Sequence, residues 1–459
     1  MTGLNHIASY IAQSNALAIP VAARELATLA LVDFVGSALA GASEPVSQLV
    51  ARQCGASASI GSASIIGHGM RTRPMEAAFA NGVIGHALDF DDSNMVLGGH
   101  PSVTLFPALL ALGQSRGYSG REVLDAYVVG FEVLMAFAHA VNFEHYEKGW
   151  HPTATLGAFG AAAAAAKLLA LNEQQAACAI GLAASMASGI KANFGTMAKP
   201  LQVGEASRRG VMCALLAADG CTASPNALDA KQGFFNIYNG SGQFRLEALS
   251  KLGDGFELLR SGIQFKKYPC CGSTHAPIDA ALSLKKQHVF TANQIEEVRI
   301  AMNPRRRPHV DRLLVTDQLS AKFSVQYTVA TALADGAVQL AHFTDDAIRR
   351  VDLQTLLRRV VLVDQKGASA LSQGCEVTVK TLRNGSVTVR LDDAQGRGSE
   401  AYPGYMKQKF EDCVQKQLDP AQAQATFQAL LSFDSHTTID TLMSRLAGHA
   451  FLPPSENLQ

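Results

Sequence analysis

Residues 89–102, with the sequence DFDDSNMVLGGHPS, hold three carboxylates in four positions and a histidine eight residues after the last of them. Carboxylates and imidazoles can exchange protons with a substrate near neutral pH, because their surroundings tune their pKa values. A metal loop and a solvated turn are the alternatives. The acids lack EF-hand spacing, and His100 has no second histidine four residues away. The stretch alone leaves a solvated turn and an acid–base site open. The acid–base site needs partners elsewhere in the chain for Asp89 and His100, with Asp91 and Asp92 as supporting or loop acids.

Three expected helix starts share one local pattern, in which a basic or imidazole side chain directly precedes a proline. The pairs are His100–Pro101, His151–Pro152 and Lys199–Pro200. Proline is favoured at the first helical position, where its missing N–H would go unpaired and its φ is already helical. The preceding residue then lies at or near the cap, where free N–H groups and the helix dipole attract anions. A residue followed by proline is also common before helices in general, so three such ends with these side chains leave both a pocket for a polyanion and ordinary helix starts open.

Two later stretches add side chains that could bind or move protons on an acid. They are QFKKYPCCGSTHAP (264–277), with Lys266, Lys267, Tyr268 and His275, and AKFSVQYTVATAL (321–333), with Lys322, Gln326 and Tyr327. The run Arg305–Arg306–Arg307 predicts a solvated basic loop, with a carboxylate clamp as the alternative.

The chain carries no signature of an organic cofactor or a metal. No G-x-G-x-x-G joins a strand to a helix, no Walker motif occurs, and the cysteines and histidines lack zinc spacing. We therefore expect acid–base chemistry with no metal and no cofactor.

Composition narrows the class of protein and its expected location. The chain has 459 residues, 48% of them apolar, and a formal net charge of zero, so we expect neither a nucleic-acid nor a membrane partner. The eight cysteines form no C-x-x-C pair, and the first residues lack a basic and an apolar signal region, which predicts reduced thiols in a cytoplasmic protein. The most apolar run, GAFGAAAAAAKLLAL, is interrupted by Lys167 and is too weakly hydrophobic to predict a membrane span.

The hydrophobic pattern predicts a mainly α protein with two domains. Helical spacing, as in 21–41, dominates residues 1–267, and the helices have short connections. Residues 268–400 mix helices (276–287, 321–335) with expected strands at 296–304 and 358–365 and a hairpin over 375–394 that turns at Asn384–Gly385. Residues 401–459 are helical again. We therefore expect a large all-helical domain into which a smaller α+β domain is inserted.

The motifs together resemble the MmgE/PrpD family, which includes 2-methylcitrate dehydratase, cis-aconitate decarboxylase and iminodisuccinate epimerase. The matching stretches are GHALDFDDS…GHPS, GWHPTATLGAFGAA, NFGTMAKPLQVGEASRRG, KKYPCCGSTH and AKFSVQYTVATAL. The resemblance implies that the smaller domain is a lid, that the active site lies between the domains, and that the protein is a homodimer. It also implies catalytic roles for Asp89, His100, His151, Lys199, Lys266 and Tyr327, and substrate binding by Ser93, Ser102 and His275.

The sequence departs from the dehydratase pattern at several positions. Val103 follows H-P-S where dehydratases have an acid, one extra residue separates Ser93 from His100, and Gln202 stands where relatives often have histidine. The stretches around His100 and His151 are closer to the iminodisuccinate epimerase branch, whereas YPCCGSTH has the general family form.

Three functions are consistent with these residues. The first is a cofactor-free lyase, of dehydratase or decarboxylase type, that acts beside a carboxylate of a small di- or tricarboxylic acid. The second is an epimerase of a substituted succinate, which needs a base on each face of the reacting carbon. The third is a non-catalytic carboxylate-binding protein, which the joint presence of the six expected catalytic residues disfavours.

Overall fold

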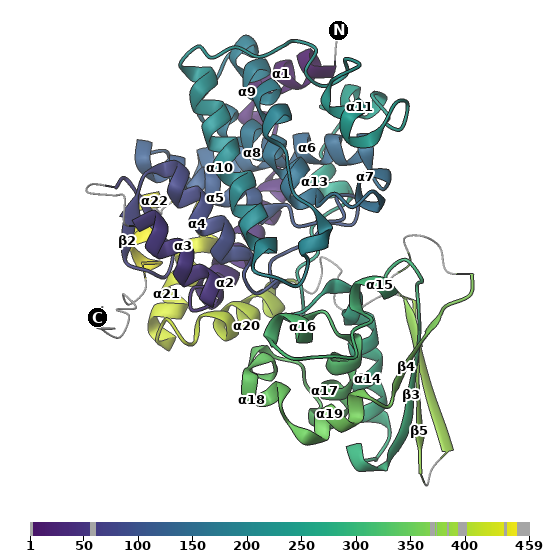
Figure 1. Cartoon of the computed structure of the whole chain (residues 1–459). Helices are drawn as coiled ribbons and strands as arrows, with labels where there is room; N and C mark the ends of the chain where they lie inside the picture. The colour runs from purple at the N-terminus through teal and green to yellow at the C-terminus, as the bar shows by residue number, and fades with distance from the viewer. Residues whose placement is uncertain are drawn as a thin grey trace, which may run out of the picture. The chain divides into compact units, whose positions relative to one another are not determined.

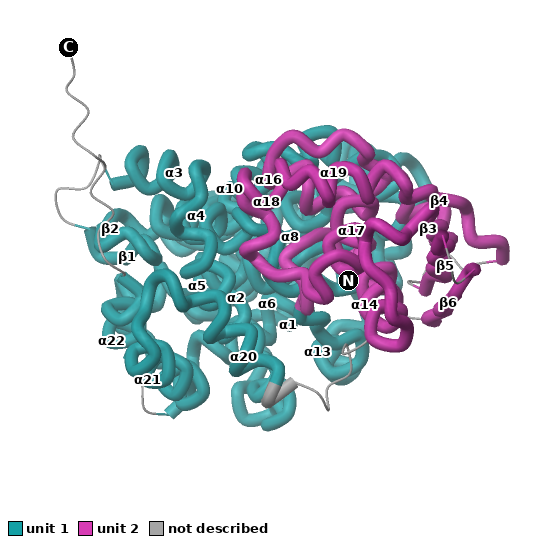
Figure 2. The backbone as a smooth tube through the Cα atoms, turned by 90° about the horizontal axis from the view of Figure 1, so that it is seen from below, with its two compact units in different colours: residues 1–265, 403–459 teal, residues 266–402 magenta. Residues whose placement is uncertain are grey.

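The computed structural model describes residues 3–55, 61–367, 372, 374–382, 385–392, 402–435 and 438–447. The chain folds into two compact units, residues 1–265 with 403–459 and residues 266–402, as Figure 2 shows in teal and magenta. The second unit is thus inserted in the sequence between two parts of the first. The expected class, mainly α with a smaller α+β part, is confirmed.

The first unit is built from helices, with one short hairpin of β1 (Ala63–Ile65) and β2 (Met70–Thr72). Its longer helices are α1 (Gly3–Gln13), α2 (Val21–Gly41), α3 (Pro45–Gly55), α4 (Pro74–His86), α5 (Ser102–Arg116), α6 (Gly120–Val141), α8 (Pro152–Leu168), α9 (Glu173–Met186), α10 (Ala198–Ala218), α20 (Tyr402–Val414) and α21 (Pro420–Leu431). Shorter helices are α7 (Glu144–Glu147), α11 (Phe234–Asn239), α12 (Glu247–Ser250), α13 (Glu257–Arg260) and α22 (Ile439–Arg445).

Small residues let the central helices of this unit approach closely. Every residue of α8 except Lys167 is buried, in a run dominated by alanine. A methyl group on Gly82 of α4 would lie 2.8 Å from the Cα of Gly204 on α10, so only glycine fits there. Helices α4, α5, α8 and α10 pack against one another, as Figure 1 shows. This packing brings the start of α10 and the end of α4 to one place.

Helix α6 is long and apolar enough, by length and composition, to cross a membrane. Buried positions make up 94% of its apolar window, so its apolar surface is covered by other parts of the protein. No disulfide links any of the eight cysteines, as expected for reduced thiols.

The second unit packs helices on one face of a four-stranded sheet (Figure 1). The strands are β3 (Ile295–Met302), β4 (Val360–Asp364), β5 (Cys375–Thr381) and β6 (Gly385–Leu391), in the order β4-β3-β5-β6. Only β3 and β4 pair in parallel. The helices are α14 (His275–Gln287), α15 (Arg307–Val310), α16 (Gln318–Lys322), α17 (Val325–Asp335), α18 (Asp345–Ile348) and α19 (Val351–Leu357).

The expected strands and the hairpin are confirmed, and Asn384 of the expected turn lies outside the described residues. The single helix expected over 321–335 is corrected. Helix α16 ends at Lys322, and α17 begins at Val325 because the Ser324 side chain caps it by accepting from the N–H of Tyr327.

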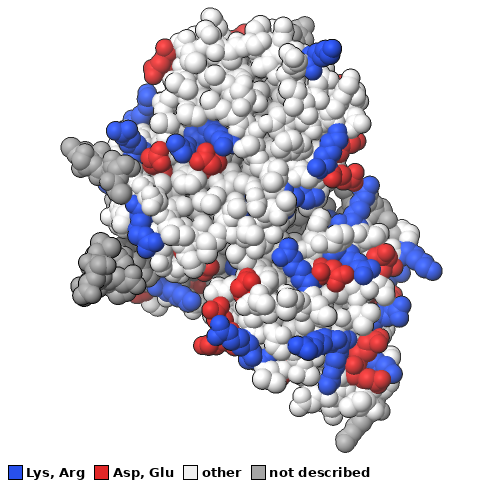
Figure 3. All heavy atoms as spheres, viewed as in Figure 1, with Lys and Arg blue, Asp and Glu red and all other residues white. Residues whose placement is uncertain are grey.

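Surface charge is mixed in sign on the face drawn in Figure 3. Lysine and arginine side chains alternate with aspartates and glutamates there, and no broad area carries one sign. This mixture agrees with the formal net charge of zero.

Candidate active site

Asp89 lies three residues after the end of α4 in a left-handed backbone conformation, with φ of +53°. Aspartate is one of the few residues with a side chain that tolerates this region, and such strain is common at functional sites. The conformation belongs to the turn in which the N–H of Asp89 donates to the carbonyl of His86 (3.1 Å). The Asp89 side chain is buried.

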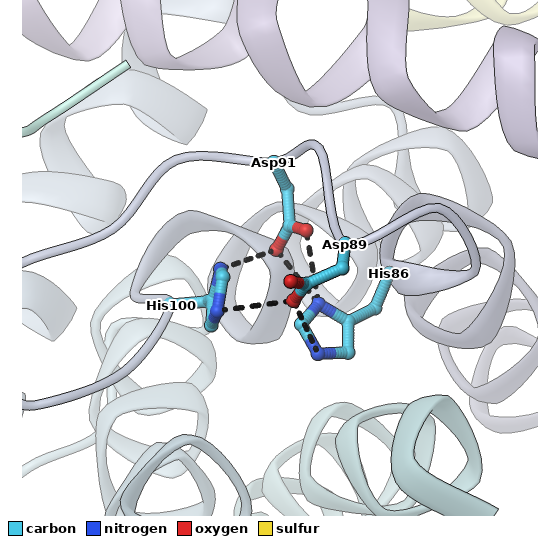
Figure 4. Close-up of side chains that lie close together, drawn as sticks. All are labelled: His86, Asp89, Asp91 and His100. Atoms are coloured by element: carbon cyan, nitrogen blue, oxygen red, sulfur yellow. Dashed lines mark hydrogen bonds and ion pairs between the residues drawn. The ribbon is translucent and has the colours of Figure 1, made fainter. Parts of the chain in front are cut away.

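The Asp89 carboxylate is surrounded by three nitrogen-bearing side chains. Its Oδ1 lies 2.5 Å from Nζ of Lys199, 3.5 Å from Nε2 of His100 and 4.0 Å from Nε2 of His86. Figure 4 shows the two imidazoles on either side of the acid. Lys199 is buried as well, so its charge and that of Asp89 compensate each other in a site with little water. The cluster therefore holds a fixed positive charge beside groups that can carry a proton.

Asp91 contacts the imidazoles of both His86 and His100. The Nδ1 of His86 is 2.9 Å from both carboxylate oxygens of Asp91, and Nδ1 of His100 is 3.2 Å from Oδ2. Burial by itself would raise the pKa of Asp91, but His86 and His100 hold it below its usual value. Burial lowers the pKa of His86 to about 4. At neutral pH a neutral His86 therefore donates its Nδ1–H to an ionised Asp91.

His151 caps α8, with Pro152 at the first helical position, as the sequence predicts. Its Nδ1 is 2.9 Å from Oε1 of Gln202, and its ring packs edge-on against Phe194. Burial, with Lys199 as the next cause, holds the pKa of His151 well below its usual value. His151 is thus a neutral imidazole at neutral pH.

The prolines of the other two pairs do not lie at the expected first helical position, although His100 and Lys199 both lie near the cap. Helix α10 begins at Ala198, so Lys199 lies inside its first turn, and Pro101 itself occupies the cap of α5. The hydroxyl of Thr196 accepts from the N–H of Ala198, which starts the helix before the proline. Proline is tolerated throughout the first turn because those N–H groups lack partners within the helix.

The loop that carries His100 depends on two glycines and one threonine. Gly98 has φ of +62°, and a methyl group on Gly99 would lie 2.5 Å from Oγ1 of Thr153. That hydroxyl accepts from the N–H of His100 at 3.1 Å. Thr153 belongs to α8, so this contact joins the backbone of His100 to the helix that His151 caps, two residues from that second imidazole.

Two buried polar contacts hold the loop from the other side. Lys409 on α20 lies 2.6 Å from Asp33 and donates to the carbonyl of Phe90 at 2.8 Å. The carboxylate of Asp92 accepts from both the N–H and the hydroxyl of Ser102. Burial and the nearby Asp33 raise the pKa of Asp92 well above its usual value.

Two family models cover most of the sequence. The MmgE/PrpD N-terminal domain matches residues 5–247, and the MmgE/PrpD C-terminal domain matches residues 268–434. The chain belongs to the MmgE/PrpD family. Relatives of this MmgE/PrpD protein include the human cis-aconitate decarboxylase, 32% identical over 341 residues that span 71% of this chain and 69% of that protein. The mouse enzyme of the same name is 31% identical over 337 residues (70% and 68%), and that of Aspergillus terreus is 27% identical over 469 residues (96% and 94%).

Two expected substrate-binding serines of the MmgE/PrpD protein lie beside the cluster. Ser93 is half-buried, and its backbone pairs with Gln264 in both directions, at 2.9 and 2.8 Å. Ser102 is buried, and its hydroxyl contacts Asp92 and, at 2.7 Å, the hydroxyl of Tyr127. Ser102 therefore orders the start of α5, and direct contact with a substrate stays a prediction for both serines.

The remaining expected site residues belong to the second unit. Lys266 is its first residue. Nε2 of His275 lies 3.3 Å from the carbonyl of Cys270, and its ring meets Tyr268 edge-on. Tyr327 is fully buried and donates its hydroxyl to the carbonyl of His342 at 2.6 Å, and burial raises its pKa to about 12. The catalytic roles of Lys266 and Tyr327 and the binding role of His275 stay predictions.

The basic run has structural partners within its own unit. Arg307 lies 3.0 Å from Asp311 and 3.2 Å from Asp364, and Arg306 donates to the carbonyl of Ser372 at 3.2 Å. These contacts explain the positions of two of the three arginines, and the explanation requires no bound carboxylate.

Sequence reasoning missed His86 and undervalued Asp91. The signal was present, since His86 lies three and five residues before two acids, but only the turn after α4 brings it onto both. Nitrogen and oxygen atoms of His86, Asp89, Asp91 and His100 lie within 4.8 Å of one another and could bind a cation. A cation there would meet the Lys199 ammonium group, which is already 2.5 Å from Asp89. The contacts therefore indicate a proton-transfer cluster instead of a metal centre.

Proposed function

We propose that this MmgE/PrpD protein is a lyase that removes CO2 from a small tricarboxylate of the cis-aconitate type, with its own side chains as acid and base and without a cofactor. The observation that carries the proposal is the buried contact of Lys199 with Asp89, flanked by the imidazoles of His100 and His86, with His151 nearby. The names of the similar decarboxylases support the same reaction.

The chemistry follows from where charge develops. When a carboxylate joined through CH2 to a carbon–carbon double bond leaves as CO2, its bonding electron pair moves through the double bond. The pair arrives at the carbon next to another carboxylate, which becomes enolate-like and negative. Lys199 and the positive dipole ends at the starts of α5, α8 and α10 can stabilise this charge, since they are fixed before the reaction in a site with little water. A protonated imidazole then delivers one proton to that carbon, so that a proton replaces CO2.

The proposal is tested by adding cis-aconitate to the purified protein. We expect one CO2 released for each substrate consumed, and a proton NMR spectrum of a product with one carboxylate fewer. His100→Ala and His151→Ala should each lower kcat by about 100-fold or more if both are acid–base groups. Consumption of the acid by addition of water, with no CO2, would replace the decarboxylase with a dehydratase. Tight binding without turnover of any tested acid would favour a carboxylate-binding protein.

An epimerase of a substituted succinate is the second candidate. It is favoured by the presence of two imidazoles, because an epimerase needs proton-transfer groups on two faces of one carbon. In deuterated water, an epimerase would introduce deuterium into a chiral succinate derivative without any net loss of carbon. That outcome would overturn the lyase proposal.

The family resemblance supports further proposals about the working protein. We propose a cytoplasmic homodimer in which Lys266, Tyr327, Ser93, Ser102 and His275 also act on the substrate. Light scattering of the purified protein tests the dimer, and fractionation of the source cell tests the location. Single variants test each residue by whether KM rises, as expected for binding, or kcat falls, as expected for catalysis.

A further inference from the structure

His100 and His151 each have one ring nitrogen occupied by a neighbour, and the two neighbours differ in charge. Nδ1 of His100 lies 3.2 Å from a carboxylate oxygen of Asp91, whereas Nδ1 of His151 lies 2.9 Å from the amide oxygen of Gln202. The ring N–H of His100 is not well aligned with Asp91 for a hydrogen bond, but attraction between charges does not depend on that alignment. Nε2 is the second nitrogen of each ring, and in His100 it faces the carboxylate of Asp89 at 3.5 Å.

The orientation of Gln202 is fixed by a second contact. Its amide nitrogen donates to the carbonyl of Ile190 at 3.2 Å, so its amide oxygen faces His151. An oxygen can only accept, so His151 must carry its proton on Nδ1, and Nε2 holds a lone pair. A neutral acceptor gives little stabilisation to an added positive charge. Lys199 opposes such a charge further, as do the nearby His86 and His100.

Asp91 acts on His100 in the opposite sense. Its carboxylate is buried, ionised at neutral pH and anchored by His86. Nε2 of His100 faces a second carboxylate, that of Asp89, at 3.5 Å. Two carboxylates stabilise an imidazolium, while Lys199, His86 and His151 are the cationic or imidazole groups that oppose it. The environments thus push the two histidines toward different protonation states, which is how enzymes separate acid from base.

We propose that Asp91 and Gln202 are positioning residues that assign opposite roles to the two histidines: His100 is the acid that delivers the proton from Nε2, and His151 stays neutral and presents an Nε2 lone pair. His86 holds Asp91 in place. The assignment rests on the proposed lyase function and adds to it which imidazole protonates the enolate-like carbon that forms when CO2 leaves. His100 then recovers its proton from solvent, so the balance per turnover is one proton taken up and one CO2 released.

The test exchanges the two partners. In Gln202→Glu, His151 gains a carboxylate, and in Asp91→Asn, His100 loses one. Nitrogen-15 spectra of histidine-labelled protein report the tautomer and titration of each ring, with His100→Asn and His151→Asn to assign the signals among the 13 histidines. Gln428→Glu on α21 and Asp254→Asn, both at exposed positions, are matched charge controls.

We expect His151 to be neutral at neutral pH in the unchanged protein. Asp91→Asn should lower the titration midpoint of His100, and Gln202→Glu should raise that of His151, each by about one pH unit or more. At neutral pH, Asp91→Asn should lower kcat by about 10-fold or more with less effect on KM, and it should shift the alkaline limb of the pH profile to lower pH. The charge controls should change none of these values.

Several outcomes would overturn the inference. They are a His151 that carries a positive charge at neutral pH, a neutral His151 with its proton on Nε2, and a titration of either ring that does not respond to its partner. Gln202 is only partly buried, so Gln202→Glu remains informative even if Asp91→Asn does not fold. Because the spectra need no turnover, the expected titrations with no CO2 release from any acid would support the inference and overturn the lyase function alone.

Discussion

The ammonium nitrogen of Lys199 lies 2.5 Å from the carboxylate of Asp89, and both side chains are buried. The contact joins the first turn of α10 to a left-handed turn after α4, 110 residues earlier in the sequence. Burying either charge without the other is unfavourable. A substitution of Lys199 or Asp89 is therefore expected to change both the activity and the stability of the protein.

Lys199→Met should destabilise the protein by about 3–5 kcal/mol, because it leaves the Asp89 carboxylate buried without its cation. Adding Asp89→Asn to this variant should recover much of that loss, since no isolated charge then remains. Activity should be lost in both variants, because the positive charge that stabilises the enolate is absent. Urea unfolding and turnover measurements check the two effects separately. A double variant no more stable than Lys199→Met would contradict the role of the pair in stability.

Gly99→Ala should lower kcat while leaving the fold intact. The added methyl group would displace Thr153, whose hydroxyl holds the backbone of His100. Gly117→Ala is the matched control, since Gly117 has φ of +72° at the end of α5 and open space around its Cα. The control should lose about 1 kcal/mol of stability from backbone strain and keep its turnover. Equal turnover in both variants would mean that the Thr153 contact does not position His100.

Acidification should destabilise the protein partly through His145, which lies outside the cluster. Its ring is buried between Asn239 and Thr155, and burial lowers its pKa to about 4. The unfolded chain binds a proton near pH 6.5 and the folded chain only near pH 4, so this stabilisation is complete above about pH 6.5 and is lost between there and about pH 4. His145→Gln should therefore lose less stability than the unchanged protein between pH 7 and pH 4, by up to roughly 3 kcal/mol. Urea unfolding at both pH values measures the difference, and parallel losses would refute the assignment.

Removal of metal ions should leave turnover unchanged. The four potential ligand side chains of the cluster are already paired with one another and with Lys199. Dialysis against EDTA followed by an assay and elemental analysis checks this expectation. Loss of activity on dialysis, restored by one divalent ion per chain, would require Lys199 to give way to a metal and would overturn the proton-transfer description.

The sequence predicted most of the helices and strands correctly because those signals are local. Helical spacing over 21–41 and alternation over 375–394 fix α2 and the β5–β6 hairpin through the positions of apolar residues. Proline at 152 likewise marks the start of α8. The signal was less reliable at Lys199, because a proline identifies the first turn of a helix and not one position within it.

The partners of the candidate residues could not be predicted in the same way. Gln202 meets His151 across 51 residues, and Lys409 reaches the carbonyl of Phe90 across 319 residues. Such contacts depend on how helices pack, which in turn depends on small residues such as Gly82 and Gly204 whose role is invisible along the chain.

The sequence by itself determined which chemical groups are available: a carboxylate at 89, imidazoles at 100 and 151, and a lysine at 199 near a helix start. Tertiary structure alone decided their electrical surroundings. It buried Asp89 with Lys199, placed Asp91 between two imidazoles and set an uncharged amide against His151. The pKa of a side chain depends on nearby charges and on the exclusion of water, and both follow from residues that only folding brings together.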